Sequence, residues 1–200
     1  MTTVPHAVTL ALLVLLSAPV ALPAAEEPGP SARLDEALKT VEGFEYGKDA
    51  GPLELAERLV VEAAADPEKR LAMEQRLVQA LAAARTSDAK DFLCRQLRTL
   101  ATARSVPVLD GMLADPELSH LARLALERIE GPTADDALLR ALERTSGKVQ
   151  AGILSTLGRR GCGKAFGIAA RLLVSPDAAV ARAAAAALGS LGSADAVKAL

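Results

Sequence analysis

The chain has 200 residues, of which 50% are hydrophobic, 24% are charged and only 2% are aromatic. This length and hydrophobic content are sufficient for a buried core in one or two domains. With so few large rings, the core must be built from Ala, Leu and Val, and we expect all-helical packing of small side chains. The formal net charge of −2 does not point to a nucleic-acid or membrane-surface partner.

The first 25 residues have the features of a secretory signal peptide. Residues 7–18 form an uncharged apolar run, followed by two prolines and then by the small residues Ala24 and Ala25. This order is typical of a signal peptide with a cleavage site near Ala24 or Ala25. An uncleaved membrane anchor is the alternative, although the run is shorter than the ~20 residues that span a bilayer. We therefore expect an exported protein, periplasmic or at the cell surface, with no membrane span after cleavage.

The next two segments are expected to be a leader and an N-terminal helical cap. Residues 26–32 are polar and contain Pro and Gly, which predicts a flexible leader. Residues 33–86 form the cap, in which apolar side chains with helical spacing predict helices. The loop of residues 43–51 contains Phe44 and Tyr46, and we expect these rings to close the open end of the helical stack.

One helix-start pattern occurs three times, as Asp66-Pro67-Glu68, Asp115-Pro116-Glu117 and Ser175-Pro176-Asp177. In each copy the first side chain can accept a hydrogen bond from an otherwise unpaired helix N–H. Proline at the first helical position has no N–H to leave unpaired, and the acid complements the helix dipole. The recurrence predicts three comparable helix starts in a serial architecture.

The C-terminal part of the sequence repeats itself with a separation of 31 residues. The matched pairs are Val149 and Val180, Leu157 and Leu188, Gly158 and Gly189, Gly161 and Gly192, and Ala165 and Ala196. A fixed period of this size marks stacked units, each of which buries its apolar face only against its neighbours. We therefore predict an all-α fold, an α-α superhelix, with about four helical hairpins in residues 87–200, the last of them incomplete.

Within each unit we expect a first helix, a tight turn and a second helix. The apolar stripes of the first helices lie in residues 93–100, 121–129, 149–157 and 180–188. Gly158 and Gly189 are expected to end the last two, because glycine accepts the left-handed conformation found after a helix C-terminus. The second helices are expected to form the inner, partner-facing surface, over residues 106–114, 135–144, 164–174 and from 194 onward.

Residues 149–173 and 180–200 resemble the short HEAT repeats of the phycobilisome-lyase type. The shared features are a leading Val, Ala-rich positions, a Leu-Gly pair, a second Gly and an Ala-led second helix. The resemblance covers roughly residues 87–200 and implies a HEAT-like, superhelical fold. It implies little about activity, because such repeats also occur in many proteins with no enzymatic role and no bilin-binding constellation is matched.

Residues 158–165 nearly match a phosphate-binding loop. The segment Gly-Arg-Arg-Gly-Cys-Gly-Lys-Ala fits that motif except at its last position, where Ala165 replaces the Ser or Thr that holds Mg²⁺. The motif must also follow a β-strand, whereas the preceding residues here predict a helix. We therefore interpret the segment as a repeat turn and expect no nucleotide cofactor.

The same turn is positively charged, since residues 148–171 contain five cations and no acid. Such an edge could receive an acidic partner or a phosphate-bearing ligand; the alternative is a solvated turn whose cations favour the preceding helix C-terminus. Nucleic acid is not expected, because interleaved aromatic rings are lacking; the only ring nearby, Phe166, is expected to be a core residue. The candidate partner-binding surface combines exposed positions of the second helices with this turn: Asp110, Arg140, Arg144, Arg159, Arg160, Lys164 and Arg171.

No group of residues predicts a catalytic or metal site. His120 is the only histidine after residue 25, and a triad or metal site needs several converging groups. Cys94 and Cys162 are expected to be free thiols, because two stacked units would separate them by roughly 20 Å, whereas a disulfide needs Cα atoms within ~7 Å. The cation next to Cys94 could lower its pKa, although we expect an unreactive helix cysteine. We expect no cofactor and no metal.

These patterns predict a non-enzymatic protein–protein interaction scaffold, and they do not identify its protein partner. One alternative is the N-terminal or accessory region of a larger exported enzyme, with a catalytic domain beyond Leu200. A second alternative, implied only by the resemblance, is a chromophore-lyase subunit, which would be cytoplasmic.

Overall fold

The computed structural model describes residues 29–199, and within this range all regular elements are helices. The expected signal peptide, residues 1–25, lies outside the described residues. Helix α1 begins at Pro30, so the last three residues of the expected leader are helical. In chain order the elements are α1 (Pro30–Val41), α2 (Gly51–Ala64), α3 (Pro67–Ala83), α4 (Ser87–Leu100), η1 (Ala103–Ser105), α5 (Val106–Asp110), α6 (Ser119–Leu126), α7 (Pro132–Glu143), α8 (Gly147–Arg160), η2 (Gly163–Ala165), α9 (Phe166–Leu172) and α10 (Ala178–Ala199).

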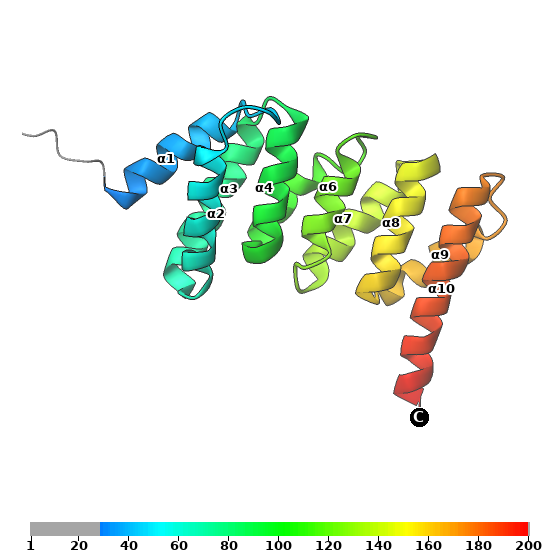
Figure 1. The fold of residues 1–200 in the computed structure, drawn as a ribbon. Coiled ribbons are helices and arrows are strands. Elements are labelled where there is room, and N and C mark those ends of the chain that lie inside the picture. Colours follow the sequence, from blue (N-terminus) through cyan, green and yellow to red (C-terminus); the bar gives the residue numbers. More distant parts are fainter. Residues whose placement is uncertain (1–28, 200) are drawn as a thin grey trace, which may run out of the picture.

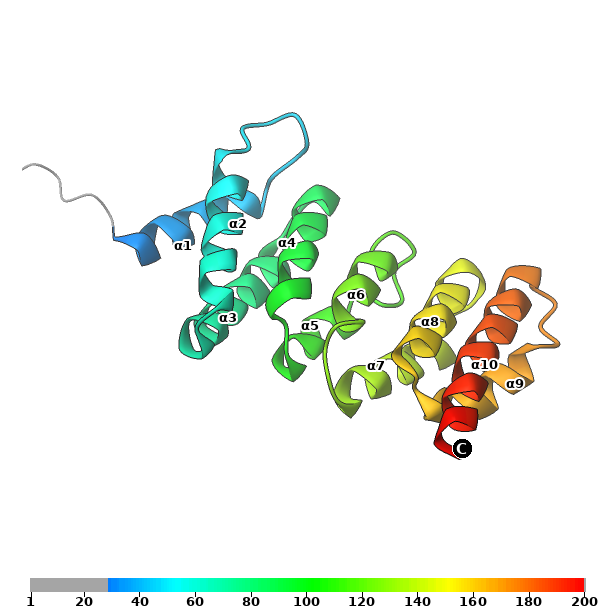
Figure 2. The same cartoon turned by 60° about the horizontal axis from the view of Figure 1, so that its bottom comes forward.

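The helices form two layers that run side by side along one row (Figure 1). The first layer contains α2, α4, α6, α8 and α10, and the second contains α1, α3, α5, α7 and α9, as the tilted view in Figure 2 shows. Helices contact their sequence neighbours, such as α7 with α8, and their neighbours within a layer, such as α4 with α6 and α8 with α10. This serial order confirms the predicted α-α superhelix. Among the described residues, no helix combines the length and hydropathy that crossing a bilayer requires.

The interior is aliphatic, as the low aromatic content predicts. Small buried alanines, such as Ala122 and Ala137, let the helices approach one another closely. The largest fully buried side chains are all leucine or isoleucine and come from consecutive elements: Leu77, Leu93, Leu97, Leu100, Leu109, Leu113, Leu126, Ile129, Leu138, Leu142, Ile153 and Leu154. The core is therefore a continuous strip between the two layers, shared by all units.

Of the three expected helix starts, the first has the predicted cap, whereas the second has the predicted hydrogen bonds in a turn that precedes α6, which begins only at Ser119. The carboxylate of Asp66 accepts hydrogen bonds from the N–H groups two and three residues on, at 3.0 and 3.2 Å, and Asp115 does the same at 2.8 and 3.2 Å. At the third start the predicted position is wrong: Ser175 accepts one bond, from the N–H of Asp177 at 3.3 Å, but the residue that caps the helix is Asp177, which accepts bonds at 2.7 and 3.3 Å. A carboxylate is a stronger acceptor than a hydroxyl, so α10 begins at Ala178.

The glycines near the end of α8 have different roles from those predicted. Helix α8 continues past Gly158 to Arg160, and Gly161 takes the left-handed conformation that ends it, with φ 67° and ψ 29°. Gly158 is instead a point of close approach, because a Cβ built on it would lie 2.9 Å from the Cα of Ala187 in α10. The prediction that Gly158 ends the helix is therefore wrong by one turn.

The last unit departs most from the prediction. Gly189 and Gly192 lie inside α10, which continues to Ala199 without the expected turn or a separate second helix from residue 194. The turn after α8 contains two glycines, Gly161 and Gly163, whereas alanine stands at the equivalent of the second one. Alanine is the best helix former and glycine among the poorest, so the segment with one glycine fewer stays helical.

The loop between α1 and α2 lies along α4 and does not cover the end of the row. Phe44 is buried, and its ring contacts the ring of Tyr46 edge-on, with 5.5 Å between the centroids. Tyr46 is 60% exposed; its backbone N–H donates to Asp88 at 2.9 Å and its hydroxyl to Asp91 at 3.0 Å. The expectation that both rings close the stack is therefore wrong: one ring joins the core and the other fastens the loop to α4.

Both cysteines are free, as predicted, and both are buried. Cys94 is fully covered within α4, and burial raises the pKa of its thiol to about 12, with the nearby Asp91 acting in the same direction. The neighbouring cation therefore does not activate Cys94 as a nucleophile. Burial also raises the pKa of Cys162.

We expect Gly158→Ala to destabilise the protein, although alanine normally stabilises a helix interior. The new methyl group would lie 3.2 Å from the Cβ of Ala187 and closer still to its backbone, so α8 and α10 must separate, at a cost of about 1–3 kcal/mol. Gly167→Ala in α9 is the matched control, because a Cβ there meets nothing within 4 Å. That variant should be neutral or more stable by about 0.5–1 kcal/mol. Thermal unfolding followed by circular dichroism compares them, and equal stability of the two variants would contradict the close approach.

Candidate partner-binding surface

Three of the seven candidate residues meet in the second layer. Asp110 ends α5, and Arg140 and Arg144 lie at the end of α7, the next helix of that layer. The guanidinium of Arg144 donates to one carboxylate oxygen of Asp110 at 2.6 Å, and that of Arg140 donates to the other at 3.1 Å. Arg144 also donates to the backbone carbonyl of Asp110 at 3.2 Å. The cluster joins two neighbouring units and leaves an excess of one positive charge on two arginines that are 57% and 44% exposed.

Three further candidates each pair with an acid of the preceding unit. The ion pairs are Arg159 with Glu127 at 2.7 Å, Arg160 with Asp135 at 2.6 Å and Lys164 with Asp136 at 2.9 Å. The positive edge predicted over residues 148–171 is therefore largely neutralised by acids of residues 127–136. Only the stacking of the units brings these two segments together.

Arg160 is the most enclosed of the candidates, with a side chain only 8% exposed. It lies under the turn that joins α6 to α7, where its guanidinium donates to the carbonyl oxygens of Leu126 at 2.6 Å and Ile129 at 2.8 Å. Longer bonds reach the carbonyls of Glu127 at 3.2 Å and Gly131 at 3.3 Å. Leu126 is the last residue of α6 and the other three follow it, so none of these carbonyls has a partner within the helix; the N–H of Ile129 also donates to Leu126, at 3.2 Å. Arg160 therefore connects two units. Because its side chain is buried, it supports the candidate surface and is not itself exposed on it.

Arg123 of α6, which the sequence analysis does not single out, makes a similar connection in the first layer. Its guanidinium donates to the carbonyl of Gly152 in α8 at 3.0 Å, and a Cβ at position 152 would lie 2.6 Å from the guanidinium carbon. Burial lowers the pKa of Arg123, and the nearby charge of Arg159 lowers it further. The hydrogen bond from Arg159 holds the pKa of Glu127 below its usual value. The one sequence signal for this contact is Gly152, a glycine inside a helix, which leaves room for the Arg123 side chain to cross α8.

The seventh candidate, Arg171, lies on the exposed side of α9. Phe166, on the same helix, is 48% exposed, and Leu173 and Val174 just after the helix are also exposed. The sequence favours Phe166 as a core residue, which is wrong, because no later second-layer helix within residues 29–199 covers this side of α9. Arg171 and these three large apolar side chains are therefore exposed at α9, the last second-layer helix within residues 29–199.

Residues 158–164 do not have the geometry of a phosphate-binding loop. They comprise the end of α8, the turn at Gly161 and the start of η2, and the Lys164 ammonium lies against Asp136. Within the described ranges no three His, Cys, Asp or Glu side chains are grouped so that they could hold a metal ion. His120 is exposed in the first turn of α6. The arrangement is suited to binding through ion pairs, hydrogen bonds and apolar contact.

Removing the Arg160 side chain should destabilise the packing of α6, α7 and α8. Arg160→Ala would leave the carbonyls of Leu126 and Ile129 and the Asp135 carboxylate without their main partner, at a cost of about 3 kcal/mol. Arg171→Ala, an exposed arginine on the next unit, should change the stability by less than about 0.5 kcal/mol. Urea unfolding of both variants measures the difference. If Arg160→Ala is no less stable than Arg171→Ala, the turn does not depend on this arginine.

The comparison with protein-family models agrees with this architecture. Residues 136–200 match the family model of HEAT repeats. The crystal structure of an engineered protein is similar at 20% sequence identity, with 80% of this chain and 79% of that chain covered and a TM-score of 0.47. No curated protein matches the chain. The matching family model is that of HEAT repeats in general, so the resemblance to the phycobilisome-lyase type stays a prediction. The match of residues 136–200 to the HEAT-repeat model supports a HEAT-repeat protein.

Proposed function

We propose that this protein is a non-enzymatic, exported scaffold that binds a protein partner along the second layer of its helical row. The observation that carries the proposal is the bonding of Asp110, Arg140 and Arg144 across two units, at 2.6 and 3.1 Å. Side chains that are already held in place lose little conformational freedom on binding, which lowers the entropic cost of association. A fixed charge pattern that extends over several units suits an extended protein partner.

The second layer also indicates the chemistry of that partner. Its positions between α7 and α9 include Arg140, Arg144 and Arg171, and these three positive charges outnumber the two nearby acids, Asp110 of α5 and Glu143 of α7. Phe166 and Val174 add exposed apolar surface next to Arg171. Interfaces commonly combine an apolar centre with complementary charge around it. We infer a partner surface that is acidic and has an apolar centre.

The non-enzymatic role and the export rest on separate support. HEAT repeats are generally non-catalytic, and the polar clusters described above are bonded to one another in ion pairs between units. Export is supported by the apolar run of residues 7–18 and the small residues at Ala24 and Ala25. If the chain is instead an accessory region of a larger exported enzyme, the same surface would hold the enzyme's own substrate or domain.

Site-specific photo-crosslinking in the native cells tests the binding surface. A benzoylphenylalanine at Glu143 or Ala170, exposed positions on α7 and α9, should give one discrete cross-linked product. The same group at Thr99, an exposed position on the first-layer helix α4, is the matched control and should give none. Arg140→Glu combined with Arg144→Glu should abolish the product from Glu143, because the charge that attracts an acidic partner is reversed.

N-terminal sequencing of the protein recovered from the same cells tests export and should show a start near Ala25. Cross-links from Thr99 alone, or a retained Met1, would contradict the proposed surface or the proposed export respectively.

A further inference from the structure

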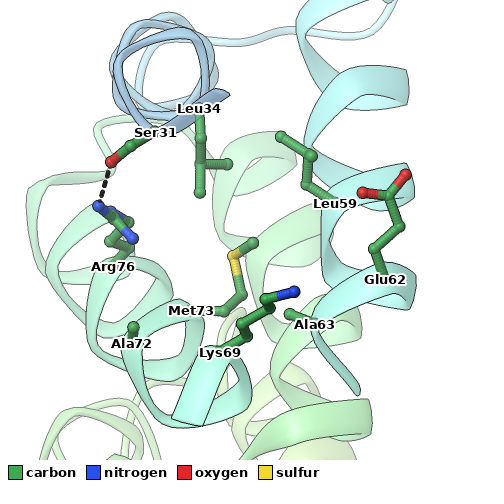
Figure 3. A pocket seen from close by; sticks show the side chains of 9 residues that line it. All are labelled: Ser31, Leu34, Leu59, Glu62, Ala63, Lys69, Ala72, Met73 and Arg76. Carbon is green, nitrogen blue, oxygen red and sulfur yellow. Dashed lines mark hydrogen bonds between the residues drawn. The ribbon is translucent and has the colours of Figure 1, made fainter. Parts of the chain in front are cut away.

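Helices α1, α2 and α3 do not close on one another, and they surround an open pocket of about 410 Å³ (Figure 3). Protein interiors are normally packed with few voids larger than a water molecule. A pocket of this volume is in the range that holds a small ligand or a few side chains. The lining residues are Ser31, Leu34, Leu59, Glu62, Ala63, Lys69, Ala72, Met73 and Arg76. This pocket lies at the opposite end of the row from α9 and is separate from the surface proposed above.

The floor of the pocket is apolar. Leu34, Ala63 and Met73 are each no more than 5% exposed, and they come from α1, α2 and α3 respectively. Leu59 forms the wall on the α2 side, and the sulfur of Met73 points toward the centre of the space in Figure 3. Methionine is flexible and polarisable, so it adapts to the shape of an inserted apolar group. The floor therefore favours a bulky aliphatic side chain.

The rim carries opposite charges on its two sides. On the α3 side, Lys69 is 73% exposed and its ammonium lies 3.7 Å from the Asp66 carboxylate, which is the outer limit of an ion pair. Arg76 stands on the same helix, held by Asp35 at 2.8 Å and Ser31 at 2.6 Å (Figure 3). On the α2 side the charged lining residue is Glu62. A ligand with an acidic group beside its apolar part would therefore bind in one orientation, with the acid toward α3.

We propose that this pocket binds a short segment of a partner protein, in which a leucine-sized side chain fills the pocket and an adjacent acidic residue pairs with Lys69. This proposal rests on the scaffold function and adds a second contact with the partner, at the other end of the row. The apolar floor supplies affinity and the charge pattern of the rim selects the acidic neighbour. Two separated contacts on one rigid scaffold would also raise the effective concentration of the partner at each of them.

Fluorescence anisotropy with the full chain tests the pocket directly. The probe is a fluorescein-labelled peptide, Gly-Ser-Leu-Leu-Glu-Glu-Ser-Gly. Ala72→Phe would fill the pocket from its exposed edge, because Ala72 lines it and is exposed, and it should weaken binding by about tenfold or more. Leu71→Phe, at an adjacent exposed residue outside the pocket, is the matched control and should bind within about twofold of the unmodified chain.

A charge exchange tests the orientation. The Lys69→Glu variant should bind the acidic probe about tenfold more weakly than the unmodified chain does. The same variant should bind a second probe, in which both glutamates are replaced by lysine, about as tightly as the unmodified chain binds the acidic probe. Circular dichroism at 222 nm confirms that each variant is folded.

Three outcomes would overturn the proposal. The probe does not bind the unmodified chain, or it binds the Ala72→Phe and Leu71→Phe variants equally well. In the third outcome, dodecanoate or a peptide of this chain's residues 18–28 binds more tightly than the probe. The last outcome would assign the pocket to a free fatty acid or to the chain's own N-terminal segment. If the peptide does not bind the pocket but Glu143 still gives its cross-linked product, the pocket proposal is wrong and the proposed function stands. If the peptide binds but the Glu143 product is absent, the proposed binding surface is wrong and the pocket proposal stands.

Discussion

Each unit of this protein is too thin to bury its own apolar side chains, and this constraint determines the rest of the structure. A pair of helices has one face toward its partner helix and another that only a neighbouring unit can cover. The fully buried leucines accordingly occur on consecutive helices, as with Leu97 in α4, Leu126 in α6 and Leu154 in α8. The row is stable because neighbours cover one another, and apolar residues such as Phe166 are exposed where no other helix within residues 29–199 covers them.

The same constraint places polar backbone groups between units, where they need partners. Arg160 supplies donors to the carbonyls that follow α6, and Glu74 of α3 supplies acceptors to the turn before α5, where it binds the N–H of Thr102 and the hydroxyl of Ser105, each at 2.6 Å. Glu74 is only 1% exposed. In both cases a side chain of one unit completes the hydrogen bonding of a neighbouring unit's turn, where buried polar groups need partners. The burial of apolar side chains and the hydrogen bonding of buried polar groups thus both depend on the stacking of the units.

The sequence is sufficient to predict the helices, their serial order and the aliphatic core, because these follow from spacing and composition within single units. It does not predict features that depend on contact between units. The 31-residue period cannot distinguish Gly158, which admits Ala187, from Gly161, which ends α8, since both recur. The cations of residues 148–171 predict a positive edge. The sequence does not show that stacking places Glu127, Asp135 and Asp136 beside them. Buried Glu74 has no local signal, and the pocket between α1, α2 and α3 depends on how three helices diverge.

A scaffold built in this way should respond to damage locally, since each unit contacts only its neighbours. Hydrogen exchange measured by mass spectrometry on the Arg160→Ala protein tests this claim most directly. The account predicts faster exchange in α6, α7 and α8, with protection in α2, α3 and α4 retained. Faster exchange spread evenly from α2 to α10 would show a single cooperative core and would contradict the account of a row of mutually dependent neighbours.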